Sequence, residues 1–98
     1  MSEHKPYTYV TTAIDQYGTR LGISFHTPDL WITVLGIDRQ RPVLSVISGE
    51  AQMSICTTGG GPVTEQDVTL ARQLADAAAS YLAECERLHS ARTGEVAA

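Results

Sequence analysis

The sequence is poor in positive charge and has no long apolar run. Among its 98 residues, seven Lys and Arg stand against eleven Asp and Glu, which gives a formal net charge of -4. This is the wrong sign for a basic surface that neutralises nucleic-acid phosphates, so we expect no binding to nucleic acid. No segment approaches the roughly 20 apolar residues that a transmembrane helix needs, so we expect no membrane span.

Cysteine is scarce as well, and the two present are Cys56 and Cys85. Two cysteines so far apart in the sequence do not form the disulfide framework of a small secreted domain. Residues 1–6 are polar and charged and lack the apolar segment of a signal peptide, so we expect them to be a disordered N-terminus. Together these absences predict a cytoplasmic protein with reduced thiols.

Motifs for metals and cofactors are missing too. His4, His26 and His89 are scattered, without the spacing of a zinc site, so no metal is expected. Three glycines at 59–61 precede a predicted helix, but no Lys follows them and the acidic residues of the first helical turn would repel a phosphate. We therefore expect no nucleotide or other cofactor.

One enzymatic alternative remains open, a cysteine nucleophile. A reactive thiolate needs a neighbouring histidine or cation, and His26, on the polar side of a predicted strand, is the candidate partner for Cys56. No other combination of acid, base and nucleophile stands out, so we assign no catalytic residue. An enzyme is the last of three functional hypotheses.

Arginine dominates the basic residues, since Lys5 is the single lysine, and alanine is frequent. In this residue usage the chain resembles short proteins encoded by actinobacteria and their phages. The resemblance rests on composition and covers no motif, so it implies no function.

Residues 7–57 have the pattern of short strands. They are rich in Thr, Val, Ile, Tyr and Trp and are interrupted by turn residues. The connections are too short for crossover helices, so sequential strands should pair antiparallel. We predict a five-stranded antiparallel β-meander with strands at about 7–15, 20–27, 30–37, 42–48 and 51–57.

The predicted strand 30–37 is apolar on both faces. Because side chains alternate across a strand, Ile32 and Val34 lie on one face while Trp31 and Leu35 lie on the other. Such a strand is usually central, and its second face needs a cover that the sheet alone does not provide.

After residue 62 the apolar period changes to about 3.6 residues, which is typical of an amphipathic helix. Thr64 and Asp67 have the spacing of a capping box, and Val63 and Val68 can form a hydrophobic staple. We predict one helix over about 65–91, ended by a glycine at 94. Its apolar stripe consists of Val68, Ala71, Leu74, Ala75, Ala78, Tyr81, Leu82, Cys85 and Leu88.

The predicted fold is a single α+β domain over residues 7–92, with the helix packed on one face of the sheet and a disordered tail at 93–98. A helix of this length spans roughly 40 Å, whereas the shorter strands span about 20 Å, so one end should project beyond the sheet. The projecting end needs a partner.

Surplus apolar surface is the basis for the main functional hypothesis. On the sheet face turned away from the helix we expect aromatic and apolar residues, and on the helix we expect a smooth alanine-rich surface. The alternative is that the sheet curls and buries these side chains itself. The interface candidates are Tyr7, Tyr9, Trp31, Leu35, Ala77 and Tyr81.

The first hypothesis is a small cytoplasmic protein-interaction module, a homodimer that binds another protein as a phage-encoded or host regulatory factor. The second is a small-molecule-binding protein with an apolar pocket between sheet and helix, and with Trp31, Tyr9 and His26 near its mouth. The sequence identifies neither the partner nor the ligand.

Overall fold

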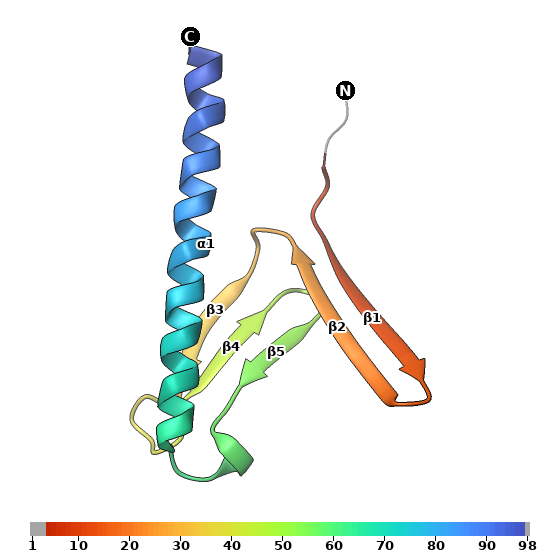
Figure 1. The fold of residues 1–98 in the computed structure, drawn as a ribbon, viewed down its shortest axis with the longest axis vertical. Coiled ribbons are helices and arrows are strands. Elements are labelled where there is room, and N and C mark those ends of the chain that lie inside the picture. The colour runs from red at the N-terminus through yellow and green to blue at the C-terminus, as the bar shows by residue number, and fades with distance from the viewer. Residues whose placement is uncertain (1–3, 98) are drawn as a thin grey trace.

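The computed structural model describes residues 4–97 and consists of strands, a short 3₁₀ turn and one long helix (Figure 1). The α+β class predicted from the sequence is confirmed. Of the predicted N-terminal tail, residues 1–3 lie outside the described part. The elements are β1 (Tyr7–Asp15), β2 (Gly18–His26), β3 (Trp31–Leu35), β4 (Val43–Ile47), β5 (Gln52–Ile55), η1 (Thr58–Gly60) and α1 (Glu65–Ala97).

The strands form two separate antiparallel sheets, so the prediction of a single five-stranded meander is wrong. β1 and β2 form a hairpin, and β3, β4 and β5 form a second sheet with β4 in the centre. The linker at 27–30 explains the break: Pro28 has no N–H to donate, and the Asp29 N–H bonds to the Thr27 hydroxyl at 3.0 Å in a local turn. The chain therefore leaves the hairpin in a new direction.

The hairpin is long and closes with a tight turn. Its register places Tyr7 opposite His26 at the open end and Asp15 opposite Gly18 at the turn. The Asp15 carboxylate accepts a hydrogen bond from the Tyr17 N–H at 2.8 Å, and Gly18 has a φ of 133°, which only glycine adopts readily. The far end of the hairpin extends away from the other elements (Figure 1).

Helix α1 begins where the sequence predicts. The Asp67 N–H donates to Thr64 Oγ1 at 3.1 Å, and the Thr64 N–H donates to Asp67 Oδ2 at 3.0 Å, which are the reciprocal bonds of a capping box.

The helix continues to Ala97, past the predicted end near residue 91. Gly94 lies within it, because a glycine inside a helix costs only about 1 kcal/mol and the residues after it favour helix. Of the predicted tail, residues 93–97 are helical and Ala98 lies outside the described part.

The first turns of α1 lie beside the three-stranded sheet, and its C-terminal part projects beyond that sheet (Figure 1). The register places Ile32, Val34, Leu44, Val46, Met53 and Ile55 on one face of this sheet. A groove of about 270 Å³ separates that face from the helix, and Val34, Leu44 and Leu74 are among its apolar lining residues. Leu74 is still 38% exposed, so helix and sheet pack loosely.

No apolar residue in the described part of the chain is buried. The accessible surface is 8694 Å², whereas a compact protein of 10.6 kDa exposes about 5,500 Å². The radius of gyration is 17.6 Å, against about 13 Å for a compact domain of this length. The elements are well formed, but within one chain their apolar faces do not cover each other.

This openness predicts that folding is linked to association. We expect the thermal midpoint of the purified protein to rise with protein concentration, because chains that fold by associating are stabilised by mass action. Circular dichroism melts over a wide concentration range measure the effect. A midpoint independent of concentration, in a species with the mass of one chain, would contradict it.

Candidate interaction surfaces

The face of the three-stranded sheet turned away from α1 carries four large apolar side chains. The register places Trp31, Leu35, Val43 and Ile47 together on it, opposite the residues that line the groove. We call this surface the outer sheet face. Trp31 is 71% exposed and Leu35 is 52% exposed. The alternation predicted for Trp31 and Leu35 is confirmed, and neither side chain is covered by the rest of the chain.

Ser45 lies in the middle of the outer sheet face and is the most buried side chain of the described residues. The register places it between Thr33 on β3 and Ser54 on β5. Its hydroxyl has no hydrogen-bond partner. Nothing in the alternation pattern distinguishes this serine from an exposed one, so sequence reasoning missed it. The outer sheet face therefore has its apolar residues on β3 and β4, on either side of a row of small hydroxyl residues, and Gln52 on β5.

The hairpin also has one apolar face, which we call the hairpin apolar face. Directly opposed residues of an antiparallel pair share a face, so the register gives this surface no charged residue. Near the tip of the hairpin its large residues are strongly exposed, with Ile14 at 77% and Leu21 at 70%, whereas Phe25 at the other end is half-buried. The hairpin apolar face consists of Thr8, Val10, Thr12, Ile14, Thr19, Leu21, Ile23 and Phe25.

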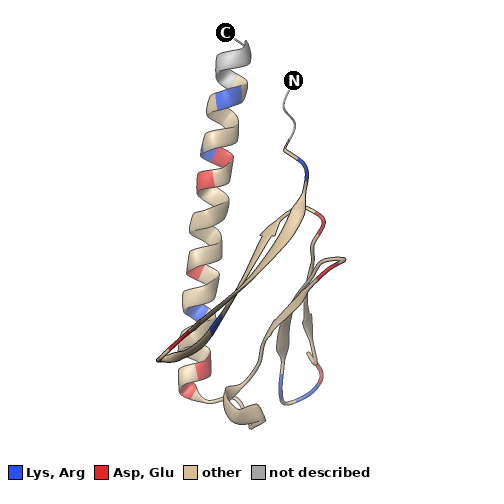
Figure 2. Cartoon of the chain, turned by 90° about the vertical axis from the view of Figure 1, so that its right-hand side faces the viewer, with Lys and Arg blue, Asp and Glu red and all other residues tan. Residues whose placement is uncertain are grey.

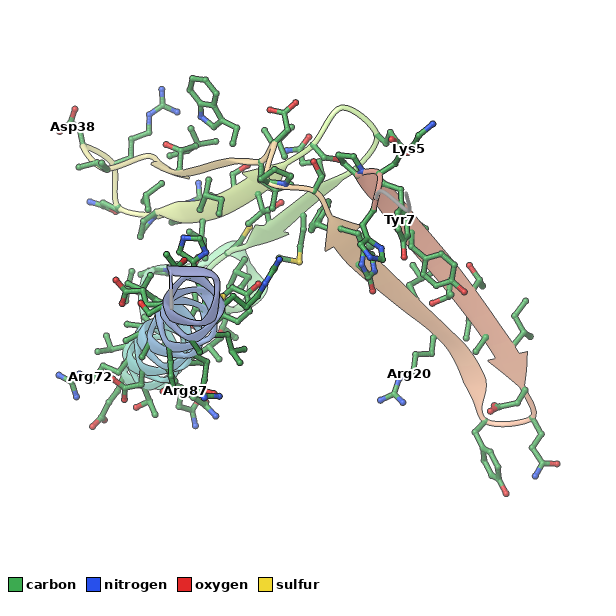
Figure 3. The ribbon with its side chains drawn as sticks, turned by 90° about the horizontal axis from the view of Figure 1, so that it is seen from above. Lys5, Tyr7, Arg20, Asp38, Arg72 and Arg87 are labelled. Atoms are coloured by element: carbon green, nitrogen blue, oxygen red, sulfur yellow. The ribbon has the colours of Figure 1, made fainter. Side chains whose placement is uncertain are left out.

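Tyr7 and Tyr9 were expected on the sheet face turned away from the helix, but they do not lie on the outer sheet face. They belong to the opposite, polar face of the hairpin, together with Arg20 and His26. The rings of Tyr7 and His26 stack, with centroids 4.4 Å apart. The expectation fails because it assumes one continuous sheet, whereas the hairpin is separate and its faces point elsewhere. Figure 3 shows Arg20 directed into the open space between the hairpin and α1.

The C-terminal part of α1 presents apolar residues without cover. Helical spacing places Ala78, Leu82 and Cys85 in line with Leu74, which lines the groove against the sheet. We call this the helix overhang stripe and define it as Ala78, Tyr81, Leu82, Cys85 and Leu88. Tyr81 is 74% exposed and Leu88 is 53% exposed.

The other side of α1 is charged. The Arg87 guanidinium pairs with the Glu84 carboxylate at 2.8 Å, which lowers the pKa of Glu84. Figure 3 shows Arg72 and Arg87 pointing away from the three-stranded sheet. Ala77, another interface candidate, is exposed on the helix between these two sides. The helix is thus two-sided from Val68 to Leu88, although only its first turns lie beside a sheet.

Most charged residues lie in the helix and in the segments between strands (Figure 2). Strands β3, β4 and β5 contain no charged residue, and the hairpin strands contain only Asp15 and Arg20, both near the tip. Charged residues of the linkers, such as Asp29 and Glu50, lie outside the strands. All three apolar surfaces are therefore uncharged, which is typical of the core of a protein interface.

Asp67 fastens the start of α1 to η1. Its carboxylate accepts hydrogen bonds from the Thr58 hydroxyl at 2.6 Å and from the Thr64 N–H at 3.0 Å. These bonds, that of Thr58 first, hold the pKa of the Asp67 carboxyl at about 2. The charge of Asp67 also suits the positive end of the helix dipole. A negative charge in this first turn would repel a phosphate at the helix start.

The glycine segment 59–61 forms a turn rather than a phosphate cradle. Gly59 and Gly60 have positive φ angles, of 61° and 72°. The Arg41 guanidinium donates a hydrogen bond to the Gly60 carbonyl. This contact ties the loop between β3 and β4 to η1.

Both cysteines are free and exposed, although Cys85 belongs to the apolar stripe predicted for the helix. Cys85 lies on the projecting part of the helix, where no sheet reaches it. Cys56 lines a pocket of about 510 Å³ with Arg39 and Arg41, and His26 is not among the lining residues. His26 instead stacks on Tyr7 in the hairpin. Among the residues that the structure describes, no three His, Cys, Asp or Glu side chains cluster as metal ligands.

The groove between sheet and helix is lined mainly by apolar side chains. None of the three residues expected at the mouth of a ligand pocket, Trp31, Tyr9 and His26, lines it. Its volume of about 270 Å³ falls just below the range of about 300–1,000 Å³ that small-molecule sites occupy. In the part of the chain that is described, no helix combines the length and the apolar character needed to cross a membrane.

Removing the N-cap should weaken the helix start. We expect Thr64→Ala to lower the free energy of unfolding by about 1 kcal/mol, because the Asp67 N–H loses its acceptor. Urea unfolding followed by circular dichroism measures the change. Gln66→Ala, in the same turn, leaves both capping bonds intact and is the control. Equal effects of the two substitutions would show that the cap contributes nothing.

Low pH should lower the stability of the helix start, where Asp67 accepts its hydrogen bonds. The folded-state pKa of Asp67 is about 2, below the ordinary 3.8, so its stabilisation is complete above about pH 4 and is lost as the pH falls through 2. We expect Asp67→Asn to be less stable than wild type at neutral pH and to lose less stability over this acid range. Carbon-detected NMR titration of the carboxyl checks the pKa, and titration near 3.8 would refute the assignment.

Comparison with protein-family models, curated proteins and solved structures finds no match to this chain. The function therefore has to be inferred from the surfaces of this chain alone.

Proposed function

We propose that the protein is an interaction module that acts by binding another protein through the outer sheet face. The single observation that carries this proposal is the exposure of Trp31 and Leu35 at the surface of a sheet whose strands contain no charge. Tryptophan is one of the residues enriched among the energetically dominant contacts of protein interfaces. An exposed tryptophan flanked by aliphatic side chains is the anchor that such an interface needs.

The chemistry of this surface favours a protein over a small molecule. The outer sheet face is a sheet surface rather than a cavity, and its central row, Thr33, Ser45 and Ser54, consists of small hydroxyl residues. A partner with a complementary apolar surface can cover Trp31, Leu35 and Ile47 at once. Small ligands instead require concave sites that bury most of their surface.

The edges of the same sheet offer a second kind of contact. β3 and β5 each pair on one side only, so each leaves backbone N–H and C=O groups without a strand partner on its outer edge. A partner strand added beside β3 would lie next to Trp31 and Leu35. The proposed partner therefore combines apolar side chains with an extended segment.

Trp31 is the only tryptophan and reports directly on this surface. We expect its fluorescence in the purified protein to be quenched readily by acrylamide, because the side chain is 71% exposed. Binding of a captured partner should shift the emission to the blue and reduce the quenching. Shielding of Trp31 in the purified protein alone would contradict the proposal, since the outer sheet face would then be covered already.

A charge on the outer sheet face should abolish capture of the partner. We expect Leu35→Asp to weaken binding by at least about 2 kcal/mol, roughly thirtyfold in Kd, by burying an unpaired carboxylate. Ser24→Asp, on the polar face of the hairpin, is the matched control and should bind like wild type. Affinity capture from the source cells identifies the partner, and titration of the purified partner gives the Kd. Equal binding by both variants would refute the assignment of the surface.

A further inference from the structure

We infer that the protein forms a homodimer by exchange of its hairpins, in which the hairpin apolar face of each copy covers the helix overhang stripe of the other. The inference shares with the proposed function the premise that uncharged apolar surface is contact surface. It concerns a different surface and a different partner, a second copy of this chain. The outer sheet face stays free for another protein.

Few contacts within one chain stabilise the hairpin. A two-stranded hairpin alone in water is marginal, and this one presents Val10, Leu21 and Ile23 to solvent. The helix of the same chain does not cover these residues. Arg20 points into the space between the hairpin and α1, and the register puts Leu21 and its neighbours on the opposite face (Figure 3). The cover must come from outside the chain.

The helix overhang stripe needs a cover of the same kind. It continues the apolar side of the helix that already faces β3, β4 and β5, so a second sheet placed above them would extend one layer along the whole helix. The overhang stripe, from Ala78 to Leu88, spans about 15 Å of the helix. Strands of nine residues span about 30 Å. The hairpin is therefore long enough to cover the whole stripe.

The amount of surface also fits a second copy. The chain exposes about 3,200 Å² more than a compact protein of its mass, so two copies carry about 6,400 Å² of surplus surface. Obligate interfaces bury about 2,000–5,000 Å² over both partners, which this surplus can supply while the outer sheet face stays free. Neither the hairpin apolar face nor the overhang stripe contains a charge, so neither needs ionic partners. In a two-fold dimer each copy supplies one hairpin and one stripe, and both surfaces are covered by the same contact.

A dimer formed by pairing of the two helices would cover only one of the two exposed apolar surfaces. Pairing of the overhang stripes would bury Tyr81, Leu82 and Leu88 but would leave the hairpin apolar face in water. Exchange of the hairpins covers both surfaces at once. It also leaves the charged side of α1, with Glu84 and Arg87, in solvent.

The test uses Cys85, which lies in the middle of the overhang stripe. One tagged chain carries Val10→Cys, Cys56→Ser and Cys85→Ser, and one untagged chain carries Cys56→Ser alone. The two are unfolded together, refolded and treated with a short bis-maleimide. We expect a covalent tagged–untagged pair, because Val10 of one copy lies over Cys85 of the other. Thr11→Cys in place of Val10→Cys is the matched control, since Thr11 lies on the polar face, and should give at least tenfold less of the pair.

A second readout avoids dependence on one cross-linking position. In the Cys56→Ser protein we expect maleimide to modify Cys85 at least tenfold more slowly than in Leu21→Asp, Cys56→Ser, whose charged hairpin cannot dock. The Arg20→Asp substitution in the same background reverses a charge on the polar face and should leave Cys85 protected.

Predominant Cys85–Cys85 pairs would overturn the exchange in favour of helix pairing. Equal pairing of Val10→Cys and Thr11→Cys, or rapid modification of Cys85 in every protein, would overturn it as well. None of these results bears on the proposed function, because that proposal is tested by Trp31 fluorescence and by the Leu35→Asp variant.

Discussion

The structure depends on a mismatch between its apolar faces and the cover that one chain can give them. Burial requires two layers that face each other, and here only the first turns of α1 face the three-stranded sheet. The outer sheet face, the hairpin apolar face and the overhang stripe have no opposing layer in the described part of the chain. This explains why strands and helix are regular while no apolar side chain among them is buried.

Local interactions, in contrast, are satisfied within the chain. The capping box of Thr64 and Asp67, the turn at Asp15 and the contact of Arg41 with Gly60 all close over short stretches of backbone. These contacts fix where each element begins and ends without fixing how the elements pack. Such a chain provides preformed surfaces, and the remaining stability has to come from association.

Sequence reasoning predicted the elements well because their signals are local. Alternation gave the two faces of β3, and the spacing of Thr64 and Asp67 gave the start of α1. It did not predict the separation of the hairpin, because strand signals in the sequence do not say which strands pair. Tyr7 and Tyr9 were placed on the wrong surface for the same reason.

The errors at the helix have a related cause. The end near residue 91 was inferred from Gly94, whose cost inside a helix is small compared with the gain from continuing it. Cys85 lies on the apolar stripe and is nevertheless exposed, because the sheet ends before the helix does. An apolar stripe shows that one side of a helix needs a packing partner. The sequence does not show whether that partner belongs to the same chain.

Small-angle X-ray scattering with parallel light scattering tests the central claim most directly. If the apolar faces are covered between chains, every folded species will have a mass at least twice 10.6 kDa, and dilution will produce unfolding rather than a folded single chain. A folded particle with the mass of one chain and a radius of gyration of about 13 Å would contradict the claim. It would mean that the hairpin and helix close onto their own sheet.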